Sequence, residues 1–175
     1  MRTSSTAALL VALLGLAPAA ARADVEGVFA LETGLSIAEP SLVVGVEGGV
    51  RLDRQWTFLL EIDWNPWFSI EGAVVHEGAL NIGVGVEHIY QDGLLRSALF
   101  VGTSTLLYQT ALDVPGTTGP FVDFVPISVR VPLEGDVVTL RIDPVSMHLL
   151  APVLSGIPLI RYEFRHVLSI ELAGR

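Results

Sequence analysis

Apolar and polar residues alternate with a period of two along most of the chain. In segment 25–37 the odd positions are mainly apolar, whereas the even positions hold the carboxylates Glu26 and Glu32 together with small residues. Successive side chains of a strand point to opposite faces, so this pattern predicts a strand with two different environments. Comparable alternation marks segments 42–52, 56–64, 79–87, 95–104, 125–131, 138–143 and 160–171. The sequence therefore predicts an all-β chain of about eight strands.

The connections between these segments alternate in length. Short polar turns are predicted at 52–55, 90–93 and 133–136, each with the composition of a hairpin. Longer links lie between these turns. The first link, at 38–41, departs from this alternation because it is short. The longer links span residues 65–75, 109–120 and 144–158. An up-and-down transmembrane barrel sorts its connections in this way, with short turns on the periplasmic side and long loops outside.

Aromatic residues fall near the ends of the predicted strands. The set comprises Trp56, Trp64, Trp67, Tyr90, Tyr108, Phe121 and Tyr162. Girdles at the two lipid–water interfaces of a barrel need this placement, because an amphipathic ring is most stable at headgroup level. The alternative interpretation is a set of ordinary core aromatics near turns.

The N-terminal residues have the organisation of an export signal. Arg2 supplies a positive charge, Ala7–Leu16 form an apolar stretch too short to span a bilayer, and Ala21–Ala23 place small residues at a signal-peptidase site. We expect a cleaved signal peptide over residues 1–23 and one outer-membrane β-barrel domain over residues 24–175. A retained membrane anchor is the alternative.

Composition narrows the class of protein further. The chain contains no cysteine, so disulfides and thiol chemistry are excluded. Two of its ten basic residues lie in the expected signal peptide, which leaves eight against 19 acids. Such a balance argues against nucleic acid as a partner. The mean hydropathy is nevertheless +0.58, although no stretch after residue 23 is long and apolar enough to be a spanning helix. Apolar surface facing lipid as a barrel explains this combination.

The predicted inward face carries charges of both signs. Its members include Glu47, Arg51, Glu61, Arg96, Arg130, Arg141 and Arg165. Together with the signal peptide, the eight alternating segments and the sorted connections, this pattern resembles the small eight-stranded outer-membrane barrel proteins, the class of the OmpA transmembrane domain and the OmpX-like proteins. The likeness covers the whole chain after residue 23 and rests on architecture alone.

The resemblance implies a location in the cell outer membrane, where lipid is the main partner and the barrel is a monomer. It also implies a structural or interaction role. An eight-stranded barrel is just wide enough to be filled by its own side chains. We therefore expect the inward carboxylates and guanidiniums to form ion pairs rather than an open channel.

Two groups of residues are candidates for catalysis. Glu61 and Asp63 lie two residues apart on one face, as an acid and base pair would, but such pairs are common in polar barrel interiors. Ser146 and His148 share a face if their segment is extended, with Asp143 nearby. A nucleophile and base at a barrel rim resemble the arrangement in outer-membrane lipid A deacylases. Because an orienting acid is not defined, we predict no enzyme activity and no catalytic residue.

The remaining titratable residues give no further site. His76, His88 and His166 lack ligand spacing, so neither a metal site nor a cofactor is predicted. The link 145–159 is too apolar for a solvated loop. Three readings of it remain open: it extends the flanking strands, folds over the barrel mouth, or offers a surface to a protein or other hydrophobic partner at the extracellular loops.

A second architecture accounts for the same alternation. In a soluble exported barrel of the calycin type, Glu47 and Arg51 would face water while Val44 and Val46 would face an apolar ligand. The sorted connections, the aromatic positions and the high hydropathy favour the membrane barrel, in which Val84 meets lipid. On that model Gly85→Ser is expected to be mild if the lumen has room for a hydroxyl.

Overall fold

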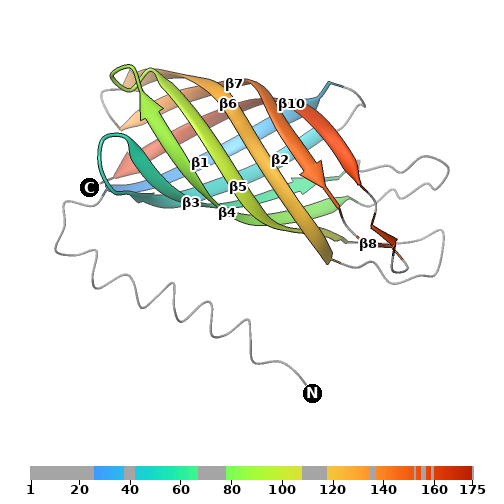
Figure 1. The fold of residues 1–175 in the computed structure, drawn as a ribbon. Helices are drawn as coiled ribbons and strands as arrows, with labels where there is room; N and C mark the ends of the chain where they lie inside the picture. Colours follow the sequence, from blue (N-terminus) through green and yellow to red (C-terminus); the bar gives the residue numbers. More distant parts are fainter. Residues whose placement is uncertain are drawn as a thin grey trace.

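The alternating segments form strands that close into one barrel (Figure 1). The computed structural model describes residues 26–37, 42–66, 78–107, 118–134, 137–151, 153–154, 157–158 and 160–174. The eight barrel strands are β1 (Glu26–Ser36), β2 (Leu42–Arg51), β3 (Trp56–Asn65), β4 (Ala79–Tyr90), β5 (Leu95–Leu106), β6 (Thr118–Glu134), β7 (Val138–Leu150) and β10 (Arg161–Gly174). The expected signal peptide lies outside the described residues. The described part holds no helix long and apolar enough to cross a membrane.

Every neighbouring pair of barrel strands is antiparallel, and the order around the barrel is β1-β10-β7-β6-β5-β4-β3-β2. The first and last strands close the barrel, with Gly27 opposite Gly174. A short hairpin of β8 (Val153–Leu154) and β9 (Ile157–Pro158) lies between β7 and β10. The predicted all-β, eight-stranded, up-and-down architecture is confirmed.

Two of the three predicted turns lie within the described residues, and both are tight. Asp53 begins the first, where its carboxylate oxygen Oδ1 accepts hydrogen bonds from the backbone N–H groups of Gln55 and Trp56 at 2.7 and 2.8 Å. In the second turn Gln91, Asp92 and Gly93 all have positive φ angles, of 50°, 55° and 90°. Left-handed residues give a two-stranded hairpin the twist it requires. In Figure 1 these turns lie at the same end of the barrel as the last residues of β10.

The alternation sorts side chains between the outside and the inside of the barrel. Large apolar residues cover the outside, including Phe58, Val84, Val101 and Leu168, and the exposed fraction of Val84 is 56%. Trp56, Trp64 and Tyr162 are also exposed at strand ends, as predicted for girdles. Trp67 and Tyr108 lie outside the described residues. Folding has thus placed apolar surface outward and charge inward, the reverse of a water-soluble protein.

Phe121 was predicted for an outer girdle, and this prediction is wrong. Its ring lies inside the barrel with an exposed fraction of 1%. It belongs to an interior apolar cluster of Leu59, Ala79, Ala98, Phe100, Leu106, Phe121, Val125 and Leu150. The aromatic ring fills space above Gly83, where an added Cβ would lie 2.6 Å from the ring atom Cζ.

Gly85 has less space around it than the predicted polar lumen would give. An added Cβ there would meet the ring of Phe100 and would lie 2.6 Å from the backbone oxygen of Leu99. The lumen therefore lacks the room that a mild Gly85→Ser change requires. We expect serine at this position to displace the Phe100 ring or to distort the pairing of β4 with β5.

Strands β6 and β7 are longer than predicted. Residues 118–120 belong to β6, and residues 144–150 of the expected link 144–158 belong to β7. Of the three readings of the apolar link, extension of the preceding strand is the one confirmed. The pairing of β6 with β7 shifts register between Phe124 and Ile127. Such a bulge inserts an extra residue and moves the following side chains to the opposite face.

Candidate functional site in the barrel interior

The centre of the lumen contains an ion-pair network that joins opposite walls. Glu47 on β2 accepts a hydrogen bond from Nη1 of Arg141 on β7 at 2.5 Å, and its other oxygen lies 3.5 Å from Nη2 of Arg96 on β5. Arg96 Nε also lies 3.0 Å from a carboxylate oxygen of Glu87 on β4. All four side chains are buried. Buried charges need partners of opposite sign, and here they find them across the barrel rather than along one strand.

A second network lies toward the end with the short turns. Glu171 on β10 accepts hydrogen bonds from Arg130 at 2.6 Å and from Arg51 at 2.9 Å. Arg51 also bonds Glu26 at 2.7 Å. Arg51 and Glu26 are partly exposed, so this network reaches from the buried interior to the barrel end. Arg141 lies 3.7 Å from Glu171 and thus links the two networks.

The half of the lumen nearer the long links contains a third group. Arg165 on β10 lies between two acids, with Nη1 at 3.2 Å from Asp63 and Nη2 at 2.8 Å from Glu163. The other oxygen of Asp63 accepts a 2.6 Å hydrogen bond from the amide of Asn81. Arg161 at the edge of the barrel lies 3.1 Å from Glu163. Asp63 and Glu163 therefore each form an ion pair with at least one arginine.

His148 on β7 faces this third group. Its Nε2 atom lies 2.8 Å from Oδ2 of Asp123 and 3.1 Å from Nη1 of Arg165. The ring of Phe121 stacks on the imidazole, with 5.9 Å between the ring centroids and 22° between the planes. Phe121 thus fixes the orientation of His148 inside the lumen.

Glu61 on β3 completes the group. Its exposed fraction is 2%, and its Oε2 atom has no hydrogen-bond partner among the residues that the structure describes. One carboxylate oxygen of Glu61, one of Asp123 and one imidazole nitrogen of His148 all lie within 4.8 Å of one another. We call Glu61, Asp123 and His148 the lumen triad.

The predicted inward charges lie where the sequence indicates. Glu47, Glu61, Arg96, Arg130, Arg141 and Arg165 are buried inside the barrel, and Arg51 is half-buried. Glu61 and Asp63 both face the lumen, but they differ in their partners: Asp63 contacts Arg165 and Asn81 whereas Glu61 contacts neither.

Ser146 and His148 share the inner face of an extended β7, as expected if the segment is a strand. Their contacts do not match a nucleophile and its base. The hydroxyl of Ser146 is buried without a hydrogen-bond partner among the described residues, and His148 Nε2 faces Asp123 and Arg165 instead. Asp143 is buried on the same face.

The remaining histidines lie on the outer side of the barrel or outside the described residues. His88 packs between Trp56 and Tyr90, with ring centroids at 4.5 and 5.7 Å. The ring of His166 hydrogen-bonds the backbone oxygen of Pro144. His76 lies outside the described residues. Asp123 is the functional candidate that sequence reasoning missed, because the expected strand began only at residue 125.

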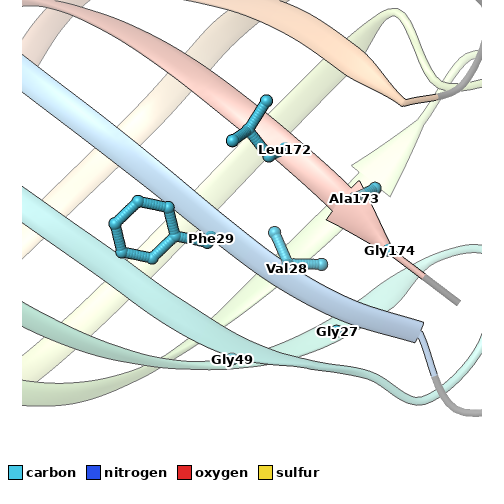
Figure 2. A pocket seen from close by; sticks show the side chains of 7 residues that line it. All are labelled: Gly27, Val28, Phe29, Gly49, Leu172, Ala173 and Gly174. Carbon is cyan, nitrogen blue, oxygen red and sulfur yellow. The ribbon is translucent and has the colours of Figure 1, made fainter.

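An apolar depression of about 370 Å³ marks the seam between β1 and β10. Its lining residues are Gly27, Val28, Phe29, Gly49, Leu172, Ala173 and Gly174 (Figure 2). No titratable side chain lines it, so it offers no group that could orient a polar ligand or catalyse a reaction.

Comparison with known proteins shows a likeness in fold. No protein-family model and no curated protein sequence matches the chain. Among solved structures, it is similar to the N-terminal β-barrel domain of Pseudomonas aeruginosa OprF, with a TM-score of 0.58, 8% identity, and coverage of 85% of this chain and 97% of that one. It is also similar to Neisserial surface protein A, with a TM-score of 0.53, 10% identity, and coverage of 85% and 94%. The chain therefore has the fold of the small eight-stranded outer-membrane barrels.

Proposed function

We propose that this protein is an integral barrel of the cell outer membrane with a structural or interaction role, and that it works without catalytic turnover. The observation that carries the proposal is that the barrel wall is apolar on its outer face and charged on its inner face. Val84, Val101 and Phe58 are exposed on the outside, while Arg96, Arg141 and Glu47 are buried on the inside. A continuous apolar exterior is stable in hydrocarbon, where no water competes for it.

The orientation in the membrane follows from the connections. Short turns lie on the periplasmic side of bacterial barrels and longer loops on the outside. We therefore expect the end of the barrel with the turns at 52–55 and 90–93, where β10 also ends, to lie in the periplasm. The opposite end carries the β8–β9 hairpin and is the surface at which we propose that any protein or hydrophobic partner binds. The barrel itself is proposed to be a monomer.

The interior argues against a soluble barrel that holds an apolar ligand. That alternative needs Val44 inside and Glu47 in water. The structure has the reverse arrangement, because Val44 is exposed on the outer face and Glu47 is buried among guanidiniums. The absence of a hydrogen bond between Ser146 and His148 likewise supports a role without hydrolysis of lipid A.

A barrel filled in this way is expected to conduct poorly or not at all. Four buried arginines and their carboxylate partners lie in the lumen, and Phe100 and Phe121 are buried there with them. Ions would have to break these pairs in order to pass. Planar-bilayer recordings on the purified protein should show no stable open level, with an open general porin as the positive control for insertion.

Faster migration of the unheated protein on an SDS gel should confirm that the same preparation is folded. A large, long-lived conductance from folded, pure protein would contradict the packed interior and the proposed role.

A further inference from the structure

The lumen triad brings two buried carboxylates together, and no arginine among the described residues forms an ion pair with either of them. In the half of the lumen nearer the long links, Arg165 and Arg161 pair with Asp63 and Glu163. The imidazole of His148 lies beside the carboxylates of Glu61 and Asp123. A buried carboxylate without a cation is strongly disfavoured, because it has lost water and gained no compensating charge.

His148 cannot satisfy both of its neighbours. Its Nε2 atom lies within hydrogen-bond distance of a carboxylate oxygen of Asp123, which requires a hydrogen on the nitrogen, and of an Arg165 nitrogen, which requires a lone pair. One ring nitrogen has only one of these at a time. The other ring nitrogen, Nδ1, is buried without a hydrogen-bond partner among the described residues. With protein groups alone, Nε2 can therefore form a proper hydrogen bond with Asp123 or with Arg165, but not with both.

Glu61 provides an independent observation at the same place. Its carboxylate is almost completely buried and directed into the triad, and its Oε2 atom has no hydrogen-bond partner in the described part of the chain. Buried polar atoms without partners are rare in folded proteins and often mark a missing ion or water.

These observations together point to a cation. We propose that Glu61, Asp123 and His148 bind a divalent transition-metal ion of the zinc class inside the barrel. Two carboxylates and one neutral imidazole balance the double charge of such an ion. An imidazole ligand favours zinc over magnesium or calcium, which prefer oxygen ligands only. If the metal binds Nε2, neither Asp123 nor Arg165 hydrogen-bonds that nitrogen. Arg165 then pairs only with Asp63 and Glu163.

The geometry allows the ion with small movements. Ligand atoms at about 2.1 Å from a tetrahedral ion lie about 3.4 Å apart, whereas the triad atoms lie within 4.8 Å of one another. Each pair of ligand atoms therefore has to approach by at most about 1.4 Å. The stacked ring of Phe121 already holds the imidazole in place.

The ion would join strands that are not neighbours. Glu61 lies on β3, which is four strands away from β7 around the barrel, and Asp123 lies on β6 beside β7. A metal at this point therefore connects opposite walls of the lumen. The role that follows is that of a structural clamp on the half of the barrel nearer the long links.

The test is a zinc titration of the chelator-treated protein folded in detergent micelles, with a coloured zinc indicator as competitor. We expect one equivalent of Zn²⁺ to bind, and we expect Glu61→Gln and His148→Gln each to weaken binding at least tenfold. Ser146→Ala, also buried on β7, and Glu26→Gln, which removes one carboxylate at the far end of the lumen, should bind zinc like the parent. His166→Gln controls for binding at an exposed histidine.

Two further measurements keep the proposal testable if a variant fails to fold. Co²⁺ added to the parent protein should give visible absorption bands of a low-coordinate nitrogen–oxygen site, and Zn²⁺ should remove them. Added Zn²⁺ should also raise the denaturant concentration at which the parent protein unfolds, because an ion that binds only the folded state stabilises it. Absence of stoichiometric zinc binding and of cobalt bands, or zinc binding that survives Glu61→Gln, would overturn the proposal.

Discussion

Val84→Arg is expected to destabilise the folded protein in lipid by about 2–4 kcal/mol. Val84 lies in the middle of β4, between Leu60 on β3 and Val101 on β5, and its side chain is exposed on the outer face. If that face meets hydrocarbon, a guanidinium there has neither water nor a carboxylate within easy reach. Equilibrium denaturant unfolding in lipid vesicles measures this loss.

Val84→Phe is the matched control at the same position. Lipid yields to a larger apolar group at almost no cost, whereas a packed protein interior is typically destabilised by 1–3 kcal/mol on overpacking. We therefore expect Val84→Phe to fold into vesicles as well as the parent. A strong loss of stability for this variant would show that Val84 packs against protein instead of lipid.

Arg141→Leu is the second change with a large expected effect. Arg141 is fully buried and contacts Glu47 at 2.5 Å, with Glu32 and Glu171 both at 3.7 Å. Removing one partner of a buried ion pair leaves an uncompensated charge and typically costs about 3–5 kcal/mol. Denaturant unfolding in the same vesicles should show a loss of this size.

The cost of Arg141→Leu should come mainly from the charge left behind. The double variant Arg141→Leu with Glu47→Gln removes both members of the pair, so we expect it to recover part of the stability that the single variant loses. A double variant that is less stable than Arg141→Leu alone would argue that packing, and not charge, sets the cost.

The number of strands and the face on which each side chain lies could be predicted from the sequence. Both follow from the alternation of apolar and polar residues with a period of two. On β4, every residue of the alternation falls on the predicted face, with Asn81 and Glu87 inside and Ile82 and Val86 outside. β4 pairs with β5 without a register shift, so nothing disturbs its pattern.

Bulges explain where the sequence prediction fails. Along β6, Phe121, Asp123 and Val125 are buried inside, but after the register shift the inward residues are Ser128 and Arg130. The inward positions therefore change from odd to even within one strand. A pattern anchored on Arg130 puts Val125 on the outer face and gives no sign that Asp123 lies in the lumen. A bulge depends on pairing with neighbouring strands, and alternation within one strand does not reveal it.

The partners of the inward charges also could not be read from the sequence. Glu47 and Arg141 are 94 residues apart and lie on strands that are not neighbours. Their contact depends on the closure of the barrel and on the relative heights of the strands. Alternation predicts the face on which a charge lies. It does not predict that residues of β3, β6 and β7 form the lumen triad, because that depends on how the strands are arranged in the closed barrel.

The central claim is that the outer face of the barrel meets lipid, and a cysteine-directed probe tests it most directly. The natural chain contains no cysteine, so Val84→Cys gives a single site for a fluorescent label in protein folded into vesicles. Lipids brominated near the middle of their acyl chains should strongly quench the label at position 84. They should have little effect on a label at Asp92→Cys, which lies in an exposed turn. A label at position 84 that is unquenched by brominated lipid and fully quenched by aqueous iodide would contradict the account.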